Sequence, residues 1–144
     1  MRGGALNSFA IGMGGPQNLR VDSPLAILFY EDLIPGTQLV NRLQDLRYRV
    51  QVAATPGELL NHAAKAGPML IFLDLVSQRN DACELIRRLR SEKPTNHVPV
   101  IGFADDAAGP LQTLAKEAGA TLVVSDSALL AHLEQFIEQA LQVE

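Results

Sequence analysis

The stretch that decides the fold is Met69-Leu70-Ile71-Phe72-Leu73-Asp74-Leu75, in which five apolar residues run into a single carboxylate. Gly67-Pro68 precede this run and a polar segment over residues 77–81 follows it, so the run has the length of one strand. Apolar runs bounded in this way are typical of strands buried on both faces, which occur in parallel sheets covered by helices. Ligands of such sheets bind outside the carboxyl ends of the strands, where Asp74 stands.

The rest of the chain alternates short apolar runs with amphipathic segments. Thr55, Pro56 and Glu58 have the spacing of a helix-start capping box, and Asp126 or Ser127 is the expected cap of the last helix. This alternation predicts right-handed crossovers and a doubly wound five-stranded parallel sheet of order 2-1-3-4-5, with helices on both faces. Strands are predicted at residues 25–30, 50–53, 69–75, 98–103 and 121–124, and helices at about 35–47, 55–66, 81–91, 109–118 and 127–143.

Composition limits both the organisation and the partners of the chain. Residues 1–23 are rich in glycine and lack a steady apolar period, so we expect a flexible tail before one domain over residues 24–144. The net charge of −4 argues against nucleic acid, and the basic group Arg87, Arg88 and Arg90 is expected to be a solvated helix face. A single cysteine, Cys83, and the lack of a membrane-length apolar run predict a cytoplasmic protein with no membrane partner.

Acidic residues end the first and third predicted strands, which flank the crevice of a sheet with this order. Glu31 and Asp32 follow the first strand, and Asp74 ends the third. Mg²⁺ takes a few carboxylates plus waters, so Glu31, Asp32 and Asp74 are the candidate metal ligands. A carboxylate at the end of a strand also bonds to backbone amides of the next loop, and the sequence leaves both interpretations of Asp74 open.

Four segments resemble the receiver (CheY-like) domain of two-component response regulators, and the resemblance covers about residues 25–142. It implies a flavodoxin-like fold, two acidic residues that bind Mg²⁺, and an aspartate that takes a phosphoryl group, at Asp74. In the family a Thr or Ser after strand 4 and a Lys after strand 5 contact that phosphoryl group. The resembling segments are Ile27-Leu28-Phe29-Tyr30-Glu31-Asp32, Leu70-Ile71-Phe72-Leu73-Asp74, Pro99-Val100-Ile101-Gly102-Phe103-Ala104 and Glu117-Ala118-Gly119-Ala120.

The residues that support phosphorylation in the family are missing here. Ala104 stands at the hydroxyl position, and Asp126 stands at the lysine position. Val123 occupies the place of the aromatic residue that moves on activation, and Ser127 replaces the usual proline. These departures predict an atypical pseudo-receiver in which Asp74, the phosphoacceptor position, is phosphorylated poorly or not at all. We expect no catalytic residues, no enzymatic activity and no cofactor except a weakly bound Mg²⁺.

The sequence therefore predicts a stand-alone receiver-like signalling domain that acts through protein contacts, with a histidine kinase or an effector protein as partner. The resemblance implies helix 4, strand 5 and helix 5 as the partner or homodimer surface. The alternative is a genuine phosphorelay receiver phosphorylated on Asp74. An enzyme or cofactor carrier on the same fold is a third possibility. A wide apolar stripe on the last helix favours a contact surface; it comprises Leu129, Leu130, Leu133, Phe136, Ile137, Ala140 and Leu141.

Overall fold

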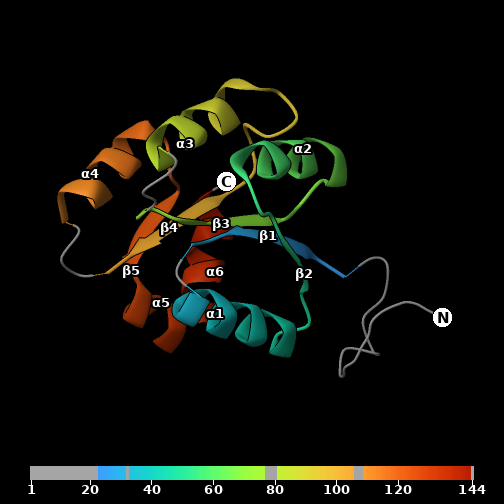
Figure 1. Cartoon of the computed structure of the whole chain (residues 1–144). Helices are drawn as coiled ribbons and strands as arrows, with labels where there is room; N and C mark the ends of the chain where they lie inside the picture. The colour runs from blue at the N-terminus through green and yellow to red at the C-terminus, as the bar shows by residue number, and fades with distance from the viewer. Residues whose placement is uncertain (1–22, 32, 77–80, 106–108, 144) are drawn as a thin grey trace.

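A computed structural model describes residues 23–31, 33–76, 81–105 and 109–143. All five strands form one parallel sheet of order β2-β1-β3-β4-β5, as predicted (Figure 1). The predicted tail lies outside the described residues, except for Ser23. The strands are β1 (Leu25–Phe29), β2 (Arg49–Val52), β3 (Leu70–Asp74), β4 (Val100–Ala104) and β5 (Leu122–Ser125). The helices are α1 (Leu33–Asp45), α2 (Pro56–Ala66), α3 (Ala82–Ser91), α4 (Gly109–Ala118), α5 (Asp126–Ala131) and α6 (Leu133–Val143).

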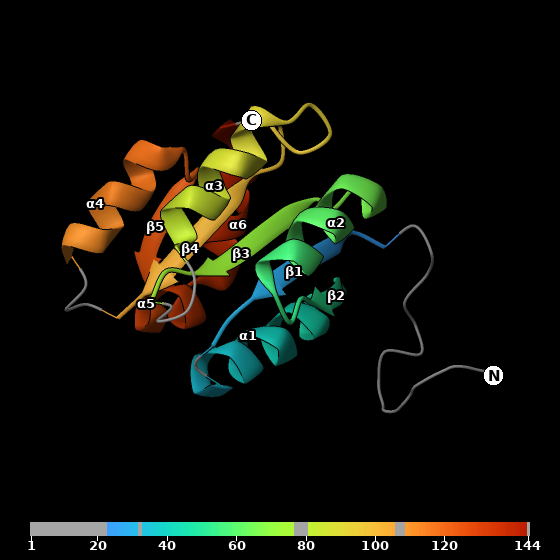
Figure 2. The same cartoon turned by 45° about the horizontal axis from the view of Figure 1, so that its top comes forward.

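Helices cover both faces of the sheet and bury its central strand completely (Figures 1 and 2). Ile71 and Leu73 of β3 pack toward α2, α3 and α4, whereas Leu70 and Phe72 pack toward α1, α5 and α6. Side chains alternate between the faces of a strand, so one apolar run supplies both halves of the core. The interpretation of residues 69–75 as a strand buried on both faces is confirmed for β3.

Capping groups fix where α2 and α3 begin. The Thr55 hydroxyl accepts a hydrogen bond from Glu58 N (3.1 Å), and Glu58 Oε1 accepts one from Ala54 N (3.2 Å). The predicted capping box is therefore present, although its glutamate reaches one residue further back than usual. Asp81 Oδ1 caps α3 by accepting from Cys83 N (3.0 Å) and from the next backbone amide. No helix in the described ranges is long and apolar enough to cross a membrane.

The last predicted helix is broken in two, which the sequence did not indicate. α5 ends at Ala131 and α6 begins at Leu133, with His132 between them at φ −132° and ψ 39°. α5 begins at Asp126 and is capped by the hydroxyl of Ser125, which accepts from Ala128 N (3.2 Å). The expectation that Asp126 or Ser127 caps this helix is wrong, because both lie inside its first turn.

The apolar stripe of the last helix belongs mostly to the core. The side chains of Leu130 and Phe136 are half-buried against the same cluster, and only Leu141, which is 38% exposed, faces outward. The stripe therefore gives little support to a partner surface on this helix. The fully buried members are Leu129, Leu133, Ile137 and Ala140.

α4 turns a different face to the core from the one that its leucines suggest. Leu114 is 51% exposed, whereas Ala115 is fully buried. The residues of α4 that pack on the core are Leu111, Ala115 and Ala118, at spacings of four and three. This spacing also suits one face of a helix, so the sequence pattern allowed two orientations of α4. In the packed structure α4 buries the less apolar of the two faces.

Three residues of α3, Arg90, Arg87 and Cys83, lie in different environments. Arg90 is not part of a solvated face, because its guanidinium donates to backbone carbonyl groups of two turns. Arg87, on the same helix, is exposed and contacts Glu84 (3.3 Å) as expected. Cys83 is a buried free thiol, and its burial, together with the charge of Asp81, raises its pKa.

Candidate functional site

Four described acidic residues stand at or just after the carboxyl ends of strands β1, β3, β4 and β5. Glu31 follows β1, Asp74 ends β3, Asp105 follows β4 and Asp126 opens α5 directly after β5. The sheet is parallel, so all of these positions lie along one edge. Asp32 lies outside the described residues.

Asp74 is buried and its carboxylate joins two loops. The residue is 4% exposed. Its Oδ2 accepts a hydrogen bond from Glu31 N (3.1 Å) and its Oδ1 accepts one from Val76 N (3.0 Å). These bonds to an ionised acceptor belong to the stronger class of protein hydrogen bonds. Asp74 therefore holds the loop after β1 against the loop after β3, which is the structural role that the sequence had left open.

The positions that the resemblance assigns to the family's switch residues carry alanine, valine and aspartate. Ala104 is 1% exposed at the end of β4, one residue beyond Phe103, the register partner of Asp74. Val123 sits within β5, half-buried against the core. A methyl group and an isopropyl group thus stand where the resemblance implies a hydroxyl and a ring. Asp126, half-buried in the first turn of α5, brings a carboxylate where it implies an ammonium.

Two of the three candidate Mg²⁺ ligands, Glu31 and Asp74, lie in the described part of the chain. Glu31 and Asp74 are adjacent, since the amide of one bonds to the carboxylate of the other. Mg²⁺ is commonly held by one or two carboxylates plus waters, and Glu31 and Asp74 both carry a carboxylate. The donor chemistry therefore fits Mg²⁺. Within the described part of the chain, no three His, Cys, Asp or Glu side chains form a metal-binding group.

The exposed apolar side chains beside this edge were not predicted from the sequence. Helix α1 begins at Leu33, two residues earlier than predicted, so Leu33 and Ile34 form its first turn and are 69% and 73% exposed. Val76, in the loop after β3, is 49% exposed. In the sequence, Leu33 and Ile34 stand directly after Glu31 and Asp32 and before Pro35. This position is the signal that could have identified them.

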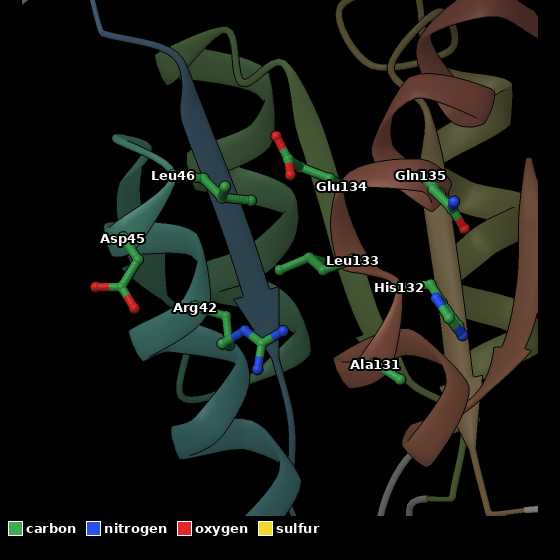
Figure 3. A pocket seen from close by; sticks show the side chains of 8 residues that line it. All are labelled: Arg42, Asp45, Leu46, Ala131, His132, Leu133, Glu134 and Gln135. Carbon is green, nitrogen blue, oxygen red and sulfur yellow. The ribbon is translucent and has the colours of Figure 1, made fainter.

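A groove of about 290 Å³ lies elsewhere, between the end of α1 and the break between α5 and α6 (Figure 3). It contains none of the predicted site residues, and its charged side chains are of both signs. The groove therefore adds nothing to the carboxylate site. Its lining residues are Arg42, Asp45, Leu46, Ala131, His132, Leu133, Glu134 and Gln135.

The role of Asp74 as a joint between loops predicts a loss of stability on replacement by asparagine. Asp74→Asn keeps one acceptor oxygen but turns an NH₂ group toward the other backbone N–H, so one hydrogen bond is lost and one buried donor is unsatisfied. We expect the free energy of unfolding to fall by about 1–2 kcal/mol, measured by urea denaturation at pH 7.

Asp45→Asn, at the exposed end of α1, is the control and should change stability by less than about 0.5 kcal/mol. If Asp74→Asn were neutral or stabilising, repulsion among the carboxylates of this edge would outweigh the two amide bonds.

No protein-family model matches the chain, and no curated protein matches it in sequence. Solved structures match its fold. The receiver domain of sensor histidine kinase PA1611 from Pseudomonas aeruginosa PAO1, described with a magnesium ion coordinated in its active-site cleft, aligns with a TM-score of 0.74 and 18% identity, over 83% of this chain and 98% of that one. The receiver domain of NtrX from Brucella abortus aligns with a TM-score of 0.73 and 19% identity, over 83% and 99%.

The chemotaxis response regulator CheY4 of Vibrio cholerae aligns with a TM-score of 0.67 and 21% identity, over 78% of this chain and 98% of that one. These alignments cover the described domain almost completely. They establish that the chain has the CheY-like, flavodoxin-like fold that the sequence predicted.

Proposed function

We propose that this chain is a receiver-type signalling module that acts through protein contacts and is not switched by phosphoryl transfer to Asp74. The observation that carries the proposal is the methyl group of Ala104, buried at the end of β4 beside the phosphoacceptor strand. The likeness to receiver domains supports the module type, and the residues around Asp74 support the lack of a switch.

The chemistry of an acyl phosphate explains why these residues matter. A phosphoryl group on a carboxylate brings several negative oxygens, which need a cation and hydrogen-bond donors around them. Ala104 offers no donor, and Asp126 adds negative charge to the edge that would receive the group. Both described hydrogen bonds of Asp74 would also have to rearrange, because its two oxygens accept from Glu31 N and Val76 N.

A Mg²⁺ ion bound at this edge would be held by Glu31, Asp32 and Asp74. When bound, it would neutralise part of the negative charge that these residues share. With no lysine at the position of Asp126, this charge relief stabilises the protein rather than preparing Asp74 for transfer.

The partner in this proposal is another protein, a histidine kinase or an effector. The surface of α4, β5 and the last predicted helix, now α5 and α6, which the resemblance implies, also remains proposed as a homodimer contact. Its support is now limited to Leu114, which is 51% exposed on α4, because the stripe on the last helix is largely buried. We propose no nucleic acid and no membrane as ligand, in accord with the net charge of −4.

The proposal predicts that Asp74 forms no stable adduct with phosphoryl donors or their analogues. The purified chain is incubated with acetyl phosphate, and separately with beryllofluoride, each with Mg²⁺. Intact-mass measurements and amide NMR spectra are then compared with those of Asp74→Ala. We expect no mass change and no Asp74-dependent spectral change. CheY4 of Vibrio cholerae is treated in parallel as the comparison receiver domain.

A stable adduct that disappears in Asp74→Ala would contradict the proposal. It would instead favour the second candidate, a genuine phosphorelay receiver phosphorylated on Asp74. The observation in favour of that candidate is the position of Asp74 itself, at the carboxyl end of β3 next to Glu31.

A further inference from the structure

The hydroxyl of Tyr48 meets the sulfur of Met69 at the amino end of the sheet. Tyr48 Oη donates to Met69 Sδ at 3.9 Å, although 21 residues separate the two positions. Tyr48 is 9% exposed and Met69 is 42% exposed, so a nearly buried hydroxyl faces a side chain at the surface. Among the described residues, this sulfur is the single hydrogen-bond partner of the hydroxyl.

Backbone hydrogen bonds hold both residues in place. Tyr48 N donates to Leu43 O (3.0 Å) in the turn after α1, and Met69 N donates to Leu25 O (2.8 Å) at the start of β1. Tyr48 directly precedes β2 and Met69 directly precedes β3, and β1 lies between these two strands (Figure 1). The fold therefore brings this hydroxyl and this sulfur together across the amino end of β1.

The thioether is a poor acceptor for this hydroxyl. Sulfur accepts hydrogen bonds only weakly, whereas buried polar groups are generally well paired. Burial raises the pKa of Tyr48, so the hydroxyl keeps its proton at neutral pH and remains a donor. The separation of 3.9 Å exceeds the usual O–H···O distance of about 2.7–2.8 Å by roughly one sulfur–oxygen bond. An oxygen atom bonded to Sδ fits this gap.

We propose that Met69 is a site of reversible oxidation, and that the oxygen of its sulfoxide accepts the hydrogen bond of Tyr48. The oxidant is a hydroperoxide. The sulfur lone pair takes one peroxide oxygen, so that the O–O bond breaks and an S–O bond forms. The hydrogen of the transferred oxygen passes through water to the other oxygen, which leaves as water or an alcohol. Sulfur loses two electrons and the peroxide gains them, and methionine sulfoxide reductases reverse the change.

Oxidation at this position stabilises the fold, which is the reverse of its usual effect. A methionine sulfoxide disrupts a core because it places a polar group among apolar side chains. Met69 is exposed, so its sulfoxide stays near water, and the Tyr48 hydroxyl exchanges a weak acceptor for a strong one. Met69 and Asp74 stand at opposite ends of β3, so the inference is independent of whether Asp74 is phosphorylated.

The test measures the thermal unfolding midpoint of the full chain before and after treatment with hydrogen peroxide. Peptide mapping by mass spectrometry should find one added oxygen on Met69. The midpoint should rise by about 3–5 °C, as expected for one additional hydrogen bond in a domain of this size. Treatment with a methionine sulfoxide reductase should restore both the mass and the midpoint.

Three variants assign the rise to the contact. Tyr48→Phe keeps the ring but removes the donor, so Met69 should still be oxidised while the midpoint does not rise. Tyr30→Phe is the matched control, because Tyr30 is the only other tyrosine of the chain, and it should show the full rise. Met69→Leu still contains Met1 and Met13, so it reports the effect of oxidising the rest of the chain and should show no rise.

Three results would overturn the inference: no oxygen on Met69 under conditions that oxidise free methionine, no rise of the midpoint in the natural chain, or an equal rise in Tyr48→Phe. A second measurement applies if Tyr48→Phe does not fold. The NMR signals of the Tyr48 ring in the natural chain should shift on oxidation and return on enzymatic reduction. Ring signals that stay unchanged on oxidation of Met69 would also overturn it.

Discussion

Replacing Arg90 with methionine is expected to lower the free energy of unfolding by about 2–4 kcal/mol. The guanidinium of Arg90 donates through Nε to Gly119 O and through Nη1 to Asn96 O and Val98 O, each at 2.8 Å, and through Nη2 to Thr121 Oγ1 at 2.7 Å. One side chain of α3 thus holds the turn before β4 and the turn before β5 together.

The expected loss is large because methionine keeps the apolar stem but none of the donors. Three carbonyl groups lose a charged partner at once, and hydrogen bonds to charged groups each contribute about 1.5–3 kcal/mol, with part of that recovered by water. The Thr121 hydroxyl keeps Val100 N as a donor (3.1 Å), so the start of β5 is weakened but not left without a bond. Lysine should restore only part of the loss, since one ammonium cannot reproduce the fork of a guanidinium.

Arg87→Met is the control for this prediction. Arg87 lies on the same helix and pairs with Glu84 at 3.3 Å, but both side chains are more than half exposed. Its replacement should cost less than about 0.5 kcal/mol. The natural chain, Arg90→Met and Arg87→Met are compared by urea denaturation at one pH. Equal losses of unfolding free energy in the two variants would show that the Arg90 hydrogen bonds add nothing to stability.

Gly36→Ala is expected to destabilise the fold by about 2 kcal/mol, although alanine is normally the better helix residue by about 1 kcal/mol. Gly36 is buried in α1, and a Cβ atom there would overlap three atoms of the Tyr30 ring. The ring would have to leave its place against the core. Tyr30 directly precedes Glu31, so we also expect changed amide NMR signals at Glu31 and Asp74.

Gly57→Ala tests the opposite case in the same kind of element. Gly57 is exposed in the first turn of α2, and a Cβ atom there would meet only the Thr55 hydroxyl, at 3.9 Å. This variant should be about 0.5–1 kcal/mol more stable than the natural chain. If Gly36→Ala were also stabilising, the packing of Tyr30 against α1 would not constrain the loop that leads into the site.

Local patterns determined much of this molecule. The apolar run that ends at Asp74, the alternation of strand and helix and the capping residue Thr55 predicted the sheet order and the start of α2. These features follow from periodicity and short-range hydrogen bonding, which act within a few residues. The meeting of Glu31 and Asp74 also follows from the sequence, because parallel strands bring their carboxyl ends to one edge.

Four features were decided only by the tertiary structure. No glycine or proline stands near His132, so no residue of the local sequence marks the break between α5 and α6. Leu114 faces outward because an equally spaced set of α4 residues fits the core. Arg90 and Asp74 bind backbone groups of turns that are distant in sequence, and no pattern in the sequence predicts these contacts.

The sequence by itself thus determined which residues form the sheet and that Glu31 and Asp74 stand at one edge of it, and it predicted that Ala104 and Asp126 occupy the places of the family's hydroxyl and lysine. The tertiary structure decided what those side chains contact. Asp74 accepts from Glu31 N and Val76 N, and Leu33 is left exposed beside them. The physical reason is that the alternation of side chains between the two faces of a strand follows from the sequence alone. A hydrogen bond between two loops depends on how the folded strands place their ends.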